Sequence, residues 1–183
     1  IDKDHFMTIS PDEGSMNRAI YLANVLGVDM GMYYKRLDYS RYVNGRHPIA
    51  AYELLGPKIE GKDMILIDDM ISSGDTIIKI ASLLKEKGAG RVYICSTFGF
   101  FTDGLDKFDD AYKKGYFDKL LTTNLVYQSP ELLEKPYYIS CDMSKYIALI
   151  IDTLNHDTSV SHLLNPVDRI KRCVANYMSQ YEK

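Results

Sequence analysis

The sequence predicts an α/β fold with a mostly parallel sheet flanked by helices, and three observations support it. Residues 64–67 (MILI) form a short unbroken apolar run, which is typical of a strand buried on both faces. The segment after it places Ile77, Ile80, Ala81 and Leu84 on one stripe, as in an amphipathic helix. Strand-like and helix-like segments then alternate along the chain, which implies right-handed crossovers with helices on both faces of the sheet.

The individual elements follow from hydrophobic periodicity. Strands are expected at 6–9, 30–34, 64–67, 92–97, 119–123 and 137–141. Helices are expected at about 15–26, directly after the 64–67 strand, over an apolar stripe at 143–154, and after Pro166. Because no repeat or low-complexity tract interrupts this alternation, we expect a single domain over residues 1–183.

The longest irregular stretch covers residues 35–48, KRLDYSRYVNGRHP, in which arginines stand among aromatic and turn-forming residues. Long loops in compact domains are usually lids or binding loops, so we expect a flexible functional loop. A solvated insertion, with Tyr-Val-Asn-Gly as a simple hairpin turn, remains the alternative.

Composition excludes several function classes. The chain has 183 residues and a net charge of −3, which gives no basic field for nucleic acid, and its apolar runs are too short to cross a bilayer. Cys95, Cys141 and Cys173 are odd in number and form no CxxC pair, so we expect a soluble protein of a reducing compartment, the cytoplasm. The chain begins with Ile1 rather than Met, and we expect this end to be a cut.

Polar residues gather where the predicted strands end. Open parallel sheets bind ligands at the carboxyl ends of their strands, near the switch in strand order. Four clusters are expected to meet there: 10–14, Lys35 with Arg36, Asp68 with Asp69, and 122–124.

The segment 72–76 (SSGDT) has the composition of a phosphate-binding turn. Its hydroxyls and successive backbone N–H groups, at the start of a helix, suit a phosphate dianion. Asp68 and Asp69 would repel a plain anion but accept hydrogen bonds from a diol, so the segment predicts a sugar phosphate, with ribose 5-phosphate as the economical candidate. Acidic pairs also serve metal or phosphoacceptor sites or cap helices. The expected substrate-binding residues are Asp68, Asp69, Ser72, Ser73, Gly74, Asp75 and Thr76, with the Asp75 side chain pointing outward.

The segment DDMISSGDT resembles the phosphoribosyl-diphosphate loop of type I phosphoribosyltransferase folds, which implies that fold here. Five segments resemble, in order, the carboxyl-terminal half of ribose-phosphate diphosphokinase, above all its longer bacterial form. They are SPDEGSMNRA at 10–19, YKR at 34–36, EGKDMILIDDMI at 60–71, TTN at 122–124 and SVSHLL at 159–164. The resemblance covers nearly all of the chain.

This resemblance implies transfer of the diphosphoryl group of Mg-ATP to the anomeric hydroxyl of ribose 5-phosphate, giving phosphoribosyl diphosphate and AMP for nucleotide biosynthesis. Such a transfer needs positioning and charge neutralisation more than covalent catalysis. Lys35 and Arg36 are the expected catalytic residues, at the start of a flexible catalytic loop over 35–48. Asp12 is the expected Mg²⁺ ligand, although alone it could simply cap a helix. The resemblance also implies a homo-oligomer.

Two departures from the family pattern bear on activity. Leu37 stands where the family has a second catalytic Arg. The family enzyme has two similar domains, and we expect the amino-terminal one to be missing here, so that the chain alone turns over ATP poorly or not at all. A phosphoribosyltransferase that consumes phosphoribosyl diphosphate and a non-catalytic sensor of phosphoribosyl ligands remain alternative functions.

Overall fold

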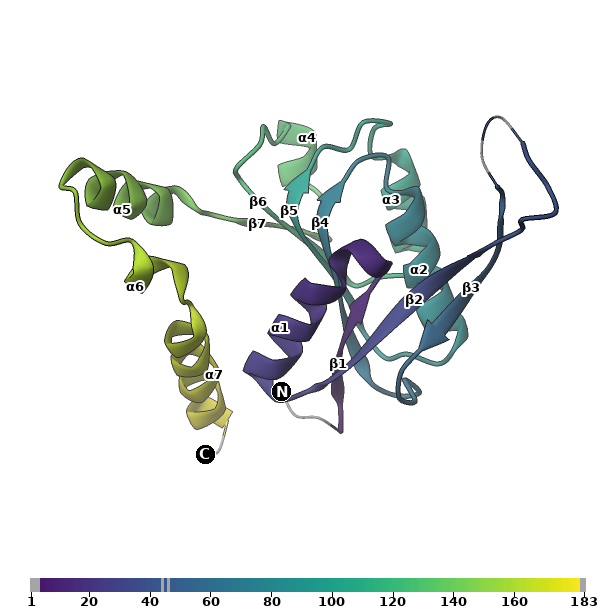
Figure 1. The fold of residues 1–183 in the computed structure, drawn as a ribbon, viewed down its shortest axis with the longest axis horizontal. Coiled ribbons are helices and arrows are strands. Elements are labelled where there is room, and N and C mark those ends of the chain that lie inside the picture. The colour runs from purple at the N-terminus through teal and green to yellow at the C-terminus, as the bar shows by residue number, and fades with distance from the viewer. Residues whose placement is uncertain (1–3, 44, 46, 182–183) are drawn as a thin grey trace.

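The computed structural model describes residues 4–43, 45 and 47–181 and contains one seven-stranded sheet (Figure 1). The strand order is β3-β2-β1-β4-β5-β6-β7, and every neighbouring pair is parallel except the antiparallel pair β2–β3. The strands are β1 Phe6–Ser10, β2 Asp29–Leu37, β3 Ile49–Leu55, β4 Asp63–Ile71, β5 Val92–Gly99, β6 Lys119–Thr123 and β7 Tyr138–Cys141. The expected mostly parallel α/β architecture is confirmed.

Helices lie on both faces of this sheet. They are the 3-10 turn η1 Glu13–Ser15 and the α-helices α1 Met16–Leu26, α2 Asp75–Glu86, α3 Asp106–Lys113, α4 Pro130–Leu133, α5 Ser144–Asn155, α6 Ser161–Leu164 and α7 Val167–Tyr181. Side chains that alternate along the central strands, such as Met64 and Leu66, form the core with α2 and α3. On the opposite face, Thr8 donates a hydrogen bond to the backbone carbonyl of Ala19 and so ties α1 to β1. No helix in the described part of the chain has both the length and the apolar character that crossing a membrane requires.

The β2–β3 hairpin corrects one predicted boundary. β2 continues through Lys35, Arg36 and Leu37, which pair with β3, so the irregular stretch begins at residue 38 rather than 35. Strand β3 was not expected, and its antiparallel pairing agrees with the simpler hairpin alternative. Asn44 lies outside the described residues, so the proposed Tyr-Val-Asn-Gly turn cannot be placed, and the flexibility of the loop stays a prediction.

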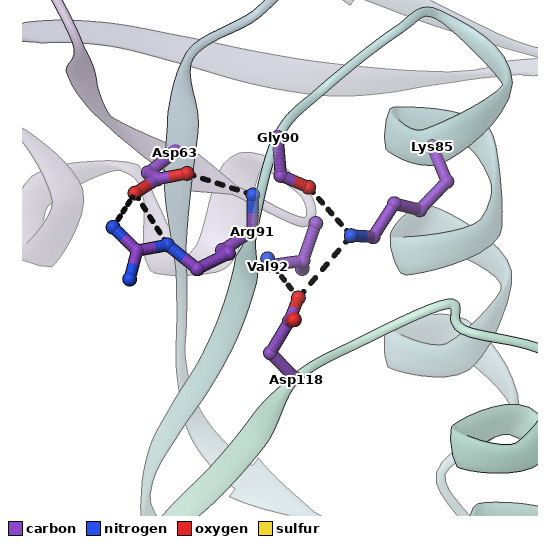
Figure 2. Close-up of polar contacts among 6 residues, drawn as sticks. All are labelled: Asp63, Lys85, Gly90, Arg91, Val92 and Asp118. Atoms are coloured by element: carbon purple, nitrogen blue, oxygen red, sulfur yellow. Dashed lines mark hydrogen bonds and ion pairs between the residues drawn. The ribbon is translucent and has the colours of Figure 1, made fainter.

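The amino ends of the central strands are joined by a network of charged side chains (Figure 2). Asp63 accepts three hydrogen bonds from Arg91, one from its backbone N–H at 2.7 Å and two from its guanidinium. Asp118 accepts hydrogen bonds from the backbone of Val92 at 2.8 Å and from Lys85 at 3.2 Å. Burial alone raises the pKa of Asp63, but the hydrogen bonds from Arg91 outweigh burial and hold that pKa below its usual value. The network holds β4, β5 and β6 in register at the end opposite the expected site.

The carboxyl-terminal part of the chain forms an arm that consists of α5, α6 and α7. Figure 1 shows α5 well apart from the sheet, whereas α7 returns to pack against α1. The amphipathic pattern of 143–154 thus predicts the helix, but the apolar side of that helix does not cover the sheet of its own chain.

Candidate functional site

The strand order places the candidate site between β1 and β4. The chain leaves β1 to form β2 on one side and β4 on the other, so the crossovers diverge at the β1–β4 pair. The segment that begins at Asp12 lies beyond the carboxyl end of β1, and the acidic pair Asp68 and Asp69 lies in the carboxyl-terminal part of β4. This is the point in an open α/β sheet where a ligand crevice is expected.

Asp12 has two partners at this edge. Its Oδ1 accepts a hydrogen bond from the backbone N–H of Gly14 at 3.0 Å and so caps η1. Its Oδ2 pairs with Lys35 Nζ at 3.0 Å, in a partly buried ion pair that joins β2 to the end of β1. The capping role that the sequence left open is therefore real, and it uses only Oδ1, so that a cation could bind Oδ2 in place of Lys35.

Asp68 and Asp69 are oriented by one residue of η1 and one residue of α1. Ser15 Oγ donates to Asp68 Oδ1 at 2.6 Å, and Arg18 approaches Asp69 Oδ2 at 3.4 Å. Burial raises the pKa of the Asp68 carboxyl, and the nearby negative charge of Asp12 raises it further against the opposing hydrogen bond from Ser15. The two carboxylates therefore make a negative region that attracts hydroxyl donors and cations.

The turn after β4 has the backbone geometry of an anion site. Gly74 is the N-cap of α2 with φ of 87°, a conformation that favours glycine. The first N–H groups of α2 have no partner within the helix and point, with the positive end of the helix dipole, toward the turn. Asp75 is directed outward, where it accepts hydrogen bonds from Lys107 at 2.7 Å and Ser73 at 2.8 Å. The expected outward orientation of Asp75 is thus what the structure shows.

Two adjoining hollows run across this edge, and Asp12 lines both. The smaller has a volume of about 150 Å³ and is lined by Asp12, Asp68, Met70, Ile71, Ser72, Ser73, Gly74, Asp75, Thr76 and Ile77. The larger has a volume of about 420 Å³ and is lined by Asp12, Glu13, Gly14, Tyr34, Lys35, Leu37 and Tyr39. A ligand with two anionic ends could occupy both hollows and pass Asp12 at the junction.

Asp12, Lys35 and Asp68, from three of the four clusters expected at this edge, line the hollows, and the fourth cluster lies elsewhere. Asn124 instead donates to Asp142 at 2.8 Å and accepts from the backbone N–H of Met143 at 2.9 Å, so it connects β6 to the start of α5. Arg36 also lies apart from the hollows, because alternate residues of a strand face opposite sides and Arg36 pairs with Glu53 of β3 at 3.3 Å. Leu37 faces the same side as Lys35 and lines the larger hollow.

Sequence reasoning assigned no role to Ser15 and Arg18. Both lie in the quoted SPDEGSMNRA segment, so the signal was their place directly after Asp12. The sequence could not predict that these two residues contact β4. That contact depends on the pairing of β1 with β4, which places the start of α1 beside the end of β4.

The donor set is compatible with a hard divalent cation bound mainly by a substrate. Within the described residues, no three side chains of His, Cys, Asp or Glu are arranged to hold a metal ion by themselves. Mg²⁺ usually keeps several waters and is held by one or two carboxylates together with substrate phosphates. Asp12 Oδ2, at the junction of the two hollows, is suited to that role.

Comparisons with known proteins agree with this geometry. Residues 3–135 match the family model described as phosphoribosyl transferase domain. The ribose-phosphate pyrophosphokinase of Vibrio parahaemolyticus serotype O3:K6 is 29% identical over 163 residues, which cover 88% of this chain and 49% of that protein. The enzyme of the same name from Thermococcus kodakarensis is 31% identical over 121 residues, 66% of this chain and 39% of that protein.

A solved structure extends the likeness to the fold. The crystal structure of phosphoribosylpyrophosphate synthetase from Mycobacterium smegmatis aligns with a TM-score of 0.69 at 24% sequence identity, over 85% of this chain and 47% of that one. The chain thus spans about half the length, or less, of the relatives it matches.

Proposed function

Because the chain belongs to the phosphoribosyl transferase domain family, we propose that it supplies the ribose-5-phosphate half of a site that makes phosphoribosyl diphosphate. In this proposal the diphosphoryl group of Mg-ATP passes to the anomeric hydroxyl of ribose 5-phosphate, AMP leaves, and the product enters nucleotide biosynthesis in the cytoplasm. The names of the relatives support phosphoribosyl diphosphate synthesis in general. The observation that carries the proposal for this chain is that Asp12 lines both hollows, the smaller one with Asp68 and the phosphate turn and the larger one with Lys35.

The smaller hollow fits the sugar phosphate. The backbone N–H groups around Gly74, with the hydroxyls of Ser73 and Thr76, would hold the 5-phosphate at the start of α2. Asp68 would accept hydrogen bonds from the 2- and 3-hydroxyls, and Asp69, which lines neither hollow, would join it only if its pair with Arg18 breaks. The raised pKa of Asp68 reflects the cost of keeping this carboxylate charged before a substrate hydroxyl reaches it.

The larger hollow fits the polyphosphate. When bound, Mg²⁺ would neutralise part of the phosphate charge, with Asp12 Oδ2 as its protein ligand. Lys35 now occupies that oxygen at 3.0 Å, so cation binding requires Lys35 to leave it. The released ammonium would then lie beside the transferred group and stabilise the charge that develops on it. Arg36 reaches this hollow only if its pair with Glu53 breaks.

Calorimetric titration with ribose 5-phosphate in the presence of Mg²⁺ tests the sugar-phosphate half directly. We expect saturable binding by the natural chain and loss of binding in a double variant with Asp68→Asn and Asp69→Asn. Asp110→Asn is a matched control, since Asp110 is an exposed residue of α3 outside both hollows, and it should bind as the natural chain does. Equal binding by the double variant, or no binding by the natural chain, would overturn the proposal.

One observation favours a second function, a sensor that binds phosphoribosyl ligands without turnover. The larger hollow presents the apolar Leu37 beside Lys35, where the resemblance leads us to expect a second arginine. A fusion protein distinguishes the two functions. It joins this chain to the part of the Vibrio parahaemolyticus enzyme that the chain does not match. A synthetase then forms AMP from ATP and ribose 5-phosphate, whereas a sensor binds both and forms none.

A further inference from the structure

The turn at residues 72–76, the phosphate turn, carries a charge that opposes its proposed ligand. Asp75 is the first residue of α2 and lines the smaller hollow. Its carboxylate is therefore an anion beside the N–H groups at the start of α2, which are the groups that a 5-phosphate would use. Such a carboxylate repels a phosphate, and the positive end of the helix attracts it into the place of the phosphate. The turn binds phosphate well only when this carboxylate is neutralised and held aside.

Lys107 of α3 holds the carboxylate of Asp75. Its Nζ donates to Asp75 Oδ1 at 2.7 Å, and Ser73 Oγ donates to the other oxygen, Oδ2, at 2.8 Å. The hydrogen bond from Lys107, followed by the one from Ser73, holds the pKa of Asp75 below its usual value. The carboxylate is thus charged at neutral pH, and both of its oxygens are engaged.

This arrangement leaves the N–H groups at the start of α2 available. The N-cap residue is Gly74, which has no side chain to cap the helix. The first hydrogen bond within α2 runs from the backbone N–H of Ile78 to the carbonyl of Gly74 at 3.0 Å, so the N–H groups of residues 75–77 precede the bonded ladder. That of Asp75 makes one long hydrogen bond, at 3.4 Å, to Ser73 Oγ.

Lys107 is itself anchored. Its Nζ also pairs with Asp103 Oδ2 at 3.1 Å, and Asp103 accepts a hydrogen bond from the hydroxyl of Thr102 at 3.2 Å. The backbone N–H of Thr102 in turn donates to the carbonyl of Ser72 at 3.1 Å. The segment that leads into α3 is therefore attached to the phosphate turn at two points, by Thr102 at Ser72 and by Lys107 at Asp75.

Packing fixes the position of Lys107 more firmly than that of Asp75. The next residue, Phe108, is fully buried, and its ring packs against Gly74 so closely that a Cβ there would lie 2.2 Å from a ring carbon. The side chain of Lys107 is 30% exposed, whereas that of Asp75 is 72% exposed. If the lysine were removed, the carboxylate would therefore be free to rotate toward the start of α2.

The ion pair matters more for charge than for the stability of the fold. Ion pairs with an exposed partner contribute little to folding, and salt screens them, so the chain should stay folded without Lys107. Its ammonium, however, serves two carboxylates, those of Asp75 and Asp103. Removing it leaves both uncompensated beside the phosphate turn.

We propose that Lys107 is a positioning residue of the phosphate turn, which neutralises Asp75 and holds its carboxylate aside so that the N–H groups of α2 stay open to a phosphate monoester. This inference rests on the proposed function of the turn as the site of the 5-phosphate. Lys107 acts through Asp75 and needs no contact with the ligand. It lies outside the segments that carry the family resemblance, so it is a feature of this chain.

A double-mutant cycle tests the proposal by calorimetry with ribose 5-phosphate and Mg²⁺ at low ionic strength. Lys107→Met should weaken binding about two- to fivefold, the size usual for one charge near the start of a helix. Adding Asp75→Asn should restore the affinity, because asparagine carries no charge. Lys113→Met is the matched control: Lys113 lies on the same helix and is 3.9 Å from Asp110 in an exposed pair outside both hollows, so binding should not change.

Ionic strength separates an effect of charge from a loss of structure. At about 1 M salt, where charges are screened beyond ~3 Å, the difference between the natural chain and Lys107→Met should shrink. A defect in the shape of the turn would persist in salt, and Asp75→Asn would not repair it. Either of these results, or equal binding by Lys107→Met and the natural chain at low salt, would refute the proposal.

A measurement without ligand keeps the proposal distinct from the proposed function. In Lys107→Met, the amide proton resonances of Thr76 and Ile77 should move downfield in NMR spectra as the carboxylate of Asp75 turns toward them. They should return when Asp75→Asn is added. Unmoved resonances would contradict the role of Lys107 whether or not ribose 5-phosphate binds. Moved resonances in a chain that does not bind ribose 5-phosphate would support that role and overturn only the assignment of the sugar phosphate.

Discussion

At the scale of single residues, the candidate site is a balance of three carboxylates and two cations. Asp12, Asp68 and Asp69 are held by Lys35, Arg18 and the hydroxyl of Ser15 before any ligand arrives. Each of these contacts can be replaced by a contact to a sugar hydroxyl, a phosphate or a cation. The residue types in the motifs were sufficient to predict most of these groups, but not which side of β2 each one faces.

The substitution Leu37→Arg tests whether the larger hollow lacks one positive charge. Leu37 faces the hollow beside Lys35, so an arginine there should bind pyrophosphate more tightly, by about 1.5–3 kcal/mol for a hydrogen bond to a charged group. Calorimetry with pyrophosphate and Mg²⁺ measures this gain. Ala51→Arg adds the same charge opposite Arg36, on the side of the hairpin that faces away from the hollow, and should change affinity little. Weaker binding by Leu37→Arg would contradict the assignment.

The raised pKa of Asp68 predicts that this residue costs stability at neutral pH. Burial above all, and to a lesser degree the neighbouring carboxyl groups of Asp69 and Asp12, raise the pKa of Asp68 and make the folded state prefer the protonated carboxyl. Stability from such a group is present below the unfolded pKa of about 3.9 and is lost as the pH rises through the higher folded value. Asp68→Asn should therefore raise the melting temperature at pH 7 and lose this advantage near pH 3.5.

Thermal unfolding followed by circular dichroism at both pH values measures the effect. Asp110→Asn is the control, because Asp110 is exposed on α3, and it should show no such crossover. A melting temperature for Asp68→Asn that is unchanged or lower at pH 7 would show that the carboxylate is not under electrostatic stress.

At the scale of elements, the local hydrophobic pattern predicted the parallel strands but did not predict β3 of the β2–β3 hairpin. Runs such as 64–67 are continuous and apolar, and nothing in their sequence competes with a buried strand. Strand β3 reads IAAYELL, whose alanine, leucine and glutamate residues favour helix, and only pairing with β2 makes it a strand. The same pairing extends β2 through Lys35 and turns Arg36 away from the site, which no local pattern indicates.

In the turn before α2, a substitution that adds a single methyl group is expected to lower the free energy of unfolding strongly. Gly74→Ala would add a methyl group at φ of 87° that overlaps the ring of the buried Phe108. We expect a loss of about 2–5 kcal/mol in the free energy of unfolding, from left-handed backbone strain and displacement of the ring. Gly27→Ala has a similar φ of 70° but open space around it, so it should lose only about 1–2 kcal/mol.

Urea denaturation of both glycine variants gives the comparison. Equal losses would mean that the contact with Phe108 relaxes without cost and that backbone conformation alone requires glycine at position 74.

At the scale of the whole molecule, the sequence predicted the fold class but not how the carboxyl-terminal arm is arranged. The sequence shows the apolar stripe of α5 clearly. Such a stripe indicates that the helix packs against some surface, but not which surface that is. Asn124 illustrates the difficulty: it was grouped with the site because it follows a parallel strand, whereas its hydrogen bonds direct α5. A place at the carboxyl end of a strand thus predicted site residues well near β1 and β4, but it predicted them poorly two strands farther away, at β6.

The position of β1 between β2 and β4 also has a consequence for how the chain folds. β1 pairs with β2 across a connection that contains α1, but with β4 only across the whole β2–β3 hairpin as well, with Ile9 opposite Leu66. Such a distant pairing is slow, because a long loop must close before any contact rewards it. Asp12 and Asp68 therefore come together only when this register forms. Ligand binding in a refolding experiment would accordingly appear after most helical signal has returned, and would mark the moment at which the sheet is complete.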